Sequence, residues 1–340
     1  MKMRTKDKII LRNVFGIVLL LSLTVFSASC QKPEKSAGPK EKVTIGVASV
    51  SATLPLIVAQ EKGYFSDGGI DVTFKFYPSG KKAMEGMFSG EADIATSAET
   101  PILHNSLLRD DFVIFATFAY SDNDSKFLGR KDKGVSKPSE LKGKKIGTVV
   151  GTGAHFFAHI YLAEHSIDLS AVTIVDIAPA DLLGALKDGK VDALVVWEPI
   201  AYQVKKALSD KVVGLPKSDL YKETFSLAAT RSYANGHPGG LIKILKAVDR
   251  ATIFIKQNKK ESLAIMTKVL KLDEDVLTST WDDFVFELSL EHSLLTILED
   301  EARWAIANKF TNKTKVPNYL GYFYLDAMKA VKPEAVTMIK

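Results

Sequence analysis

Two similar stretches of the sequence place a glutamate at matching positions. GEADIATSAETPI spans residues 90–102, and GKVDALVVWEPI, which starts 99 positions later, spans residues 189–200. Each has an aspartate three residues after its first glycine and a glutamate nine residues after it, Glu99 in one and Glu198 in the other. At a helix start, such a glutamate interacts favourably with the helix dipole. In a ligand cleft, the same side chains would repel an anion and attract an ammonium group or a hydrogen-bonding ring.

Segments rich in Ser, Thr and Gly follow the predicted strands and offer the groups that bind oxyanions. They are VSATLP, YPSG, TSAETP, AYSDNDS, GTGAHF and WEP. Hydroxyl groups donate hydrogen bonds, glycine lets a ligand approach the backbone, and free N–H groups at an exposed helix start favour an anion by about 0.3–1 kcal/mol. Any one segment fits an ordinary N-cap equally well. Several together, on matching edges of two units, predict an oxyanion site.

Ring side chains follow two of the predicted strands. GTGAHFFAH, residues 151–159, lacks the third glycine of a dinucleotide fingerprint. His155 and His159 lie four residues apart, but no HExxH glutamate or cysteine joins them, so we expect no metal. A tight turn would present His155 and Phe156 to a cleft, where the histidine could donate to an anion, or His155 lies on a helix surface. Trp197 is either a core residue or a surface on which a ligand stacks.

The sequence lacks the usual motifs of catalysis. There is no G-x-S-x-G motif and no P-loop, and Cys30 is the sole cysteine. We therefore expect neither enzymatic activity nor a cofactor.

The elements that position these residues alternate between short β-branched runs and amphipathic stretches. Alternation of this kind predicts parallel sheets covered by helices. Strands are predicted at 42–49, 71–78, 92–97, 112–121, 126–130, 144–150, 172–178, 193–197 and 211–216, and helices at 54–65, 81–90, 100–111, 154–167, 181–189 and 199–210. After residues 225–235 the pattern is wholly helical, including residues 274–288.

The second half of this pattern repeats the first about 100 residues later. The best match sets Val72, Phe74, Pro78, Gly90 and Asp93 against Val172, Ile174, Pro179, Gly189 and Asp192. This spacing is too long for a solenoid unit and predicts two similar α/β lobes. The C-terminal helices are expected to complete the first lobe.

The N-terminus has the features of an export signal. The chain is 46% hydrophobic and carries a net charge of +5, most of it in residues 1–29. Beyond them no basic block stands out, so nucleic acid is not expected as a partner. An apolar run, residues 14–26, and the small residues SAS precede Cys30. We expect a signal peptide over residues 1–29. The SAS–Cys30 segment resembles the lipobox of bacterial lipoproteins, which implies a lipidated Cys30 followed by a flexible tether, together residues 30–41. A plain cleavable signal is the alternative.

Four stretches resemble the substrate-binding lipoproteins of ABC importers for taurine, alkanesulfonates, nitrate and thiamine precursors. They are residues 54–74, 90–95, 140–156 and 185–199, and the resemblance covers residues 42–235. It implies a periplasmic-binding-protein type II fold, with lobe I from residues 42–122 and 228–340 and lobe II from 123–227. The crossovers would lie near residues 120–124 and 224–228. It also implies a cleft ligand, a membrane permease as partner, a monomer, and a periplasmic or cell-surface location. By the same resemblance the cleft would use Ser51, Ser79, Gly80, Ser97, Tyr120, Thr152, His155 and Trp197.

The leading ligand hypothesis is a small sulfonate such as taurine. Its sulfonate would bind helix ends, and its ammonium group would lie near Glu99 or Glu198. A pyrimidine precursor of thiamine is the next candidate, whereas two carboxylates disfavour nitrate or bicarbonate. The same fold also serves small biosynthetic enzymes and sensor modules.

Overall fold

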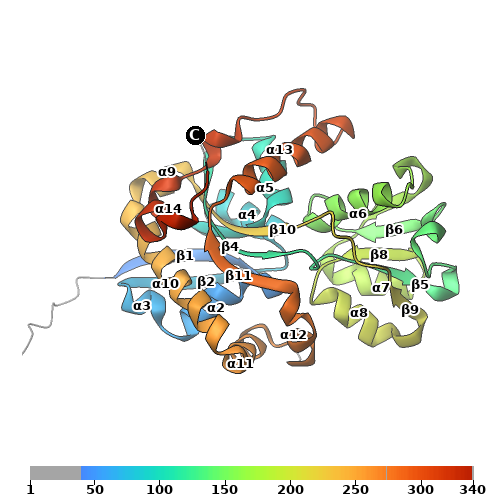
Figure 1. Cartoon of the computed structure of the whole chain (residues 1–340), viewed down its shortest axis with the longest axis horizontal. Coiled ribbons are helices and arrows are strands. Elements are labelled where there is room, and N and C mark those ends of the chain that lie inside the picture. The colour runs from blue at the N-terminus through green and yellow to red at the C-terminus, as the bar shows by residue number, and fades with distance from the viewer. Residues whose placement is uncertain (1–39, 273, 339–340) are drawn as a thin grey trace, which may run out of the picture. The chain divides into compact units, whose positions relative to one another are not determined.

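Two β-sheets, each covered by helices, organise the chain (Figure 1). The computed structural model describes residues 40–272 and 274–338, and chain contacts group Lys40–Lys340 into one unit. The expected signal peptide, Cys30 and nearly all of the tether lie outside the described residues. Among the described residues, no helix has the length and apolar character needed to cross a bilayer.

The larger sheet has the strand order β11-β4-β10-β3-β1-β2. Strand β1 is parallel to β2 and β3, whereas β10 is antiparallel to β3 and β4, and β11 is antiparallel to β4. The strands are β1 (Glu41–Ala48), β2 (Ile70–Tyr77), β3 (Ile94–Ala98), β4 (Phe112–Ser121), β10 (Glu223–Thr230) and β11 (Phe284–Ser289). We refer to this sheet and its helices as lobe I.

The smaller sheet has the order β7-β6-β8-β5-β9. Strand β6 is parallel to β7 and β8, and β5 is antiparallel to β8 and β9. The strands are β5 (Lys126–Arg130), β6 (Lys145–Thr148), β7 (Thr173–Asp176), β8 (Ala193–Val196) and β9 (Val212–Gly214). This sheet and its helices form lobe II, at the right of Figure 1.

Helices cover the sheets because each presents an apolar stripe to them. In α10 the buried residues Leu241, Ile244, Leu245 and Val248 recur at the spacing of one helix face. Lobe I carries α2 (Leu54–Glu61), α3 (Tyr64–Asp67), α4 (Gly80–Phe88), α5 (Glu99–Ser106), α9 (Arg231–Gly236), α10 (Pro238–Gln257), α11 (Lys259–Leu270), α12 (Glu274–Thr280), α13 (His292–Ala307) and α14 (Leu325–Val331), and lobe II carries α6 (Gly153–Glu164), α7 (Leu182–Lys187) and α8 (Ile200–Leu208).

The repeated Gly-x-x-Asp pattern forms the same structural join in both lobes. Gly90 and Gly189 follow α4 and α7 with φ values of 78° and 72°, a conformation that glycine adopts without strain. The amide of Thr44 donates to Oδ2 of Asp93 at 2.7 Å, and the amide of Lys145 donates to Oδ2 of Asp192 at 2.9 Å. Each aspartate therefore ties the entry of one strand to the start of its parallel neighbour.

The C-terminal region is not wholly helical, so that prediction was wrong. Residues 284–289 form β11, in which Phe284, Phe286 and Leu288 are buried while Val285 is 38% exposed. This alternation has the period of a strand, whereas α12 ends earlier, at Thr280.

The second crossover also differs from the expected position. Residues 224–228, and with them the expected boundary between 227 and 228, lie inside β10, which pairs with β3 and β4 of lobe I. The strands instead place the crossovers between β4 and β5 and between β9 and β10. The first crossover thus falls at the end of the predicted range.

Candidate functional site

A pocket lies between the two lobes, and both lobes and both crossover regions contribute to its walls. It holds about 450 Å³ of space not filled by protein atoms, including its open mouth. The lining residues are Ala48, Val50, Thr53, Ser79, Gly80, Lys81, Thr96, Ser97, Ala98, Pro101, Phe118, Asp124, Thr152, Gly153, Trp197, Glu223 and Phe225.

The N-terminus of α4 forms the wall in lobe I. Ser79 caps this helix, since its Oγ accepts from the amide of Lys82 at 3.3 Å. Helix α4 and strand β3 approach closely at Gly80, so that a Cβ on this residue would lie 2.9 Å from Cα of Ser97. No described residue accepts a hydrogen bond from the backbone N–H of Gly80 or Lys81. These N–H groups and the helix dipole favour an anion at this wall.

Lys81 reaches from this wall to lobe II. Its Nζ donates to the carbonyl oxygen of Val150, in the turn before α6, at 3.0 Å. The lysine therefore places a positive charge beside the free N–H groups of α4. An anion bound there would interact with the helix dipole, the N–H donors and the ammonium group of Lys81 together.

Two buried carboxyl groups, Asp124 and Glu223, also line the pocket. Their residues are 3% and 5% exposed. Oδ1 of Asp124 accepts from the amide of Glu198 at 3.2 Å, and Oε2 of Glu223 accepts from Oγ of Ser125 at 3.3 Å. Burial, reinforced by the charge of Glu198, raises the pKa of Asp124 to about 8. Burial and the nearby acids raise the pKa of Glu223 well above its usual range.

Glu223 also changes the character of the α6 N-terminus. A Cβ on Gly153, the first residue of α6, would lie 2.1 Å from Oε1 of Glu223. The carboxyl group therefore sits against the helix start that the sequence indicated as part of an anion site. The carboxyl group disfavours an anion at this end of the pocket whenever it is ionised, which leaves α4 as the better anion site.

The structure brings part of the predicted set together in this pocket. Ser79, Gly80, Ser97, Thr152 and Trp197 line it, and Phe118 and Phe225 add aromatic surface. Ser51 is buried but does not line the pocket, and its Oγ has no hydrogen-bond partner among the described residues. Tyr120 is half-buried at the end of β4, where Nζ of Lys222 lies 3.5 Å from the centre of its ring.

Glu99 and Glu198, for which a place in the cleft was one of two alternatives, do not line this pocket. Glu99 accepts from the amide of Thr224 at 2.7 Å and from the hydroxyl of Tyr221, and burial raises its pKa to about 6. Oε2 of Glu198 accepts from the amide of Tyr202 at 2.9 Å, in the first turn of α8. Both glutamates lie at helix starts, where the alternative interpretation of the repeat places them.

His155 and Phe156 pack against α13 and do not line the pocket. The ring centroid of Trp304 lies 5.4 Å from that of His155, 4.9 Å from that of Phe156 and 4.9 Å from that of His159. We call His104, His155, His159, Trp304 and Phe310 the histidine–tryptophan cluster; it joins α6 of lobe II to α5 and α13 of lobe I. Burial lowers the pKa of His155 to about 3 and those of His104 and His159 to about 4.

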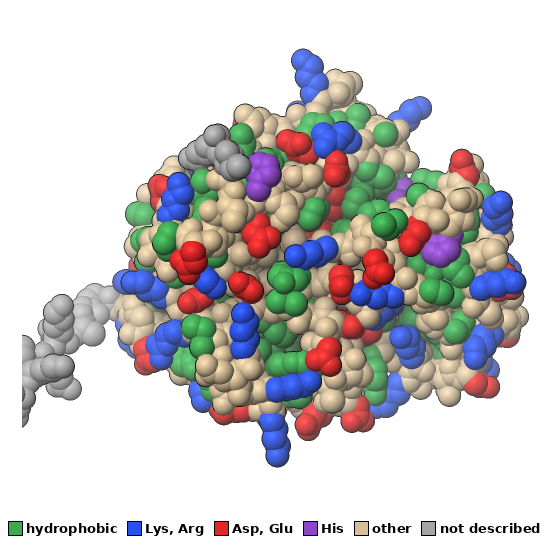
Figure 2. Space-filling view, viewed as in Figure 1, with side chains coloured by type: hydrophobic (Ala, Val, Ile, Leu, Met, Phe, Trp, Pro, Cys, Tyr) green, Lys and Arg blue, Asp and Glu red, His purple; other side chains and the backbone are tan. Residues whose placement is uncertain are grey.

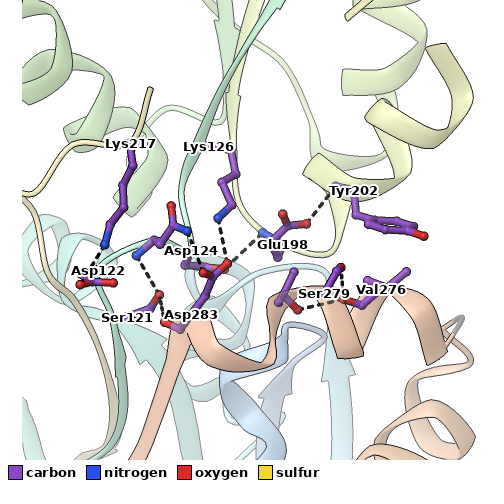
Figure 3. A network of polar contacts seen from close by, with 12 residues as sticks. Ser121, Asp122, Asp124, Lys126, Glu198, Tyr202, Lys217, Val276, Ser279 and Asp283 are labelled. Atoms are coloured by element: carbon purple, nitrogen blue, oxygen red, sulfur yellow. Dashed lines mark hydrogen bonds and ion pairs between the residues drawn. The ribbon is translucent and has the colours of Figure 1, made fainter. Parts of the chain in front are cut away.

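A second contact between the lobes lies at the first crossover (Figure 3). Nζ of Lys126 in β5 donates to Oδ2 of Asp283 at 2.8 Å, and Nδ2 of Asn123 donates to its Oδ1 at 2.7 Å. Asp283 directly precedes β11, so these contacts connect the crossover to lobe I. Lys126, which is near Asp124, is thereby paired with another carboxylate.

Sequence reasoning missed Asp124, Glu223, Lys81 and the pocket phenylalanines. Asp124 lies in the loop AYSDNDS, which was assigned to the ligand edge, but nothing in the loop distinguishes it from Asp122. Lys81 directly follows the predicted Gly80. Glu223 begins the returning strand β10, and only the antiparallel pairing of β10 with β4 brings it to the first crossover.

Two lobes with a cleft between them are the arrangement of the type II periplasmic-binding-protein fold. The chain belongs to the NMT1/THI5-like family, whose sequence pattern matches residues 51–262. A Bacillus subtilis (strain 168) protein named for aliphatic sulfonate binding is 27% identical over 267 residues, covering 77% of this chain and 80% of its own length. The taurine-binding periplasmic protein of Escherichia coli K12 is 23% identical over 225 residues, covering 64% and 67%.

A solved structure supports the fold. The alkanesulfonate-binding protein SsuA from Xanthomonas axonopodis pv. citri, bound to MOPS, superposes with a TM-score of 0.73 at 17% identity, covering 84% of this chain and 98% of its own. The predicted α/β, two-lobed type II fold is thus confirmed. No group of three or more His, Cys, Asp or Glu side chains in the described ranges is arranged to hold a metal ion.

Proposed function

We propose that the protein is the solute-binding component of an ABC importer and that it captures a small organic sulfonate. The observation that carries this proposal is the anion site at the start of α4. There the free N–H groups of Gly80 and Lys81 and the Lys81 ammonium group line one wall of the cleft. The names of the relatives from B. subtilis and E. coli agree with this ligand class.

Capture would proceed by closure of the lobes on the ligand. A ligand that contacts both lobes favours the closed state by its differential affinity for that state. Ser79 and Ser97 line the pocket from lobe I, and Thr152 and Trp197 line it from lobe II. A ligand held between these walls would present a closed form of the protein to a membrane permease.

The protein would act outside the cytoplasm, tethered by a lipid on Cys30. On the face drawn in Figure 2, basic and acidic side chains are interspersed. The relatives carry the names of binding proteins, which supports transport over catalysis.

An aminopyrimidine is the second candidate ligand. The buried carboxyl groups Asp124 and Glu223 and the ring of Trp197 line the same pocket. Carboxyl groups can accept hydrogen bonds from ring amino groups, and an indole can stack on a flat ring.

The test is calorimetric titration of residues 40–340 with sulfonates, nitrate, bicarbonate and aminopyrimidines. Lys81→Met keeps the aliphatic stem and removes the charge, and we expect sulfonate affinity to fall by about 10–100-fold, as for loss of a charge-assisted hydrogen bond of about 1.5–3 kcal/mol. Lys82→Met is the matched control, since the Lys82 side chain is exposed and pairs with Glu85. Equal affinities for both variants would contradict the assigned anion site, and binding of an aminopyrimidine alone would favour the second candidate.

A further inference from the structure

Asp124 and Glu223 approach the pocket from the two crossover regions. Asp124 lies between β4 and β5, and Glu223 is the first residue of β10. No described residue donates a hydrogen bond to Oδ2 of Asp124 or to Oε1 of Glu223. Each group is therefore more than nine-tenths buried, lines the pocket and keeps one oxygen available to a ligand.

The protein supplies few positive charges to balance these acids. The charged groups that act on Asp124 are Glu198, Lys126 and Asp283, and Nζ of Lys126 is hydrogen-bonded to Asp283. The groups that act on Glu223 are all acidic, namely Asp124, Glu99 and Glu301. Buried carboxylates are ordinarily paired with a cation, and without one they take up a proton.

We infer that Asp124 and Glu223 form a subsite for a protonated nitrogen, so that the ligand carries an ammonium or amidinium group in addition to its anionic group. This inference rests on the proposed function and narrows the ligand to a zwitterion. The sulfonate would bind at the start of α4, and the cation would bind at the crossovers.

Two further features of the pocket agree with a cation at this wall. Trp197, Phe118 and Phe225 line the pocket, and aromatic faces attract a cation within about 6 Å of the ring centroid. Glu223 lies against the start of α6, and its ionised form disfavours an anion there. The arrangement therefore separates an anion end from a cation end.

Binding of a cation to this subsite requires the ionised carboxylate. Because the pKa of Asp124 is raised to about 8, this group is mostly protonated at pH 6 in the unliganded protein. Binding then releases a proton, so affinity for the zwitterion should rise with pH, by roughly 25-fold from pH 6 to 7.5. A sulfonate without an amino group should not show this rise.

The test is calorimetric titration of residues 40–340 with 2-aminoethanesulfonate and with propanesulfonate, which has a methyl group in place of the ammonium group. We expect the aminosulfonate to bind at least about 30-fold more tightly, since a paired buried charge contributes more than a methyl contact. Asp124→Asn and Glu223→Gln should each weaken aminosulfonate binding about tenfold or more and leave propanesulfonate affinity within about twofold. Asp122→Asn, exposed in the same loop and paired with Lys217, is the matched control.

The outcomes separate this inference from the proposed function. If both sulfonates bind equally and the Asp124 and Glu223 variants behave like wild type, the subsite is overturned while sulfonate capture stands. Binding of an aminopyrimidine that Asp124→Asn abolishes, without sulfonate binding, would support the subsite and overturn sulfonate capture. Absence of binding by every probe would overturn both. Thermal unfolding shows whether a variant is folded, and the wild-type pH profile with the two sulfonates tests the subsite without any substitution.

Discussion

The histidine–tryptophan cluster should make the protein less stable in acid, and His159→Phe should remove part of this effect. The pKa of His159 is lowered to about 4 by burial, whereas an unfolded histidine titrates near 6.5. The unfolded chain therefore binds more protons between these values. Stability contributed by the neutral ring is present above about pH 6.5 and is lost as the pH falls toward 4.

The magnitude follows from the two pKa values. At pH 5, about 1.5 units below the pKa of an unfolded histidine, protonation stabilises the unfolded chain by roughly 2 kcal/mol, whereas the folded ring stays mostly neutral. Phenylalanine keeps a ring against Trp304, whose centroid lies 4.9 Å from that of His159. The variant should thus lose roughly 2 kcal/mol less free energy of unfolding than wild type between pH 7.5 and pH 5.

The variant has to be compared with wild type because buried acids have the opposite effect on the pH dependence of the free energy of unfolding. Asp124 and Glu99, with pKa values raised to about 8 and 6, take up protons in the folded state and stabilise it as the pH falls. The assay is urea unfolding at both pH values, followed by far-ultraviolet circular dichroism. His292→Phe, at an exposed position at the start of α13, is the control. A pH dependence for His159→Phe equal to that of wild type would refute the argument.

Two further predictions concern the aspartates that connect neighbouring strands and the tether. Asp93→Ala and Asp192→Ala should each lower the free energy of unfolding by about 1–3 kcal/mol, because each leaves a backbone N–H without its carboxylate. Urea unfolding measures the loss, with Asp188→Ala as an exposed control, and a negligible effect at both positions would contradict the role that the two aspartates share. Cys30→Ser should move the protein from the membrane fraction to the soluble fraction of cells, and a protein that stays with membranes would argue against the lipid anchor.

The sequence patterns predict the sheets well because strands and helices alternate with different periods. The bounds predicted for β4 and β5 agree with the structure, since both are bordered by polar or charged residues. Strand β11 was missed because FVFELS directly follows a helical stretch, and a short apolar run does not distinguish the two periods. The pairing of β10 with β4 depends on residues far apart in the chain, which no local pattern records.

The candidate site shows the same division between local and tertiary information. The family resemblance implied Ser79, Gly80, Ser97 and Thr152, which lie in segments at the ends of strands, and the carboxyl ends of parallel strands meet at one edge of a sheet. Asp124 and Glu223 lie in crossover regions, whose meeting depends on how the whole chain returns to lobe I. The sequence does not decide between two places for Glu99 and Glu198, because a helix start and a cleft edge share the same sequence signal.

The duplicated aspartate joins have a consequence for how the cleft can open. Asp93 holds β3 to β1 inside lobe I, and Asp192 holds β8 to β6 inside lobe II. Each join therefore moves with its own lobe as part of a rigid body. Opening instead has to separate Lys81 from Val150 and α6 from Trp304. A motion of one lobe against the other would thus break a few side-chain contacts between the lobes and leave both sheets intact.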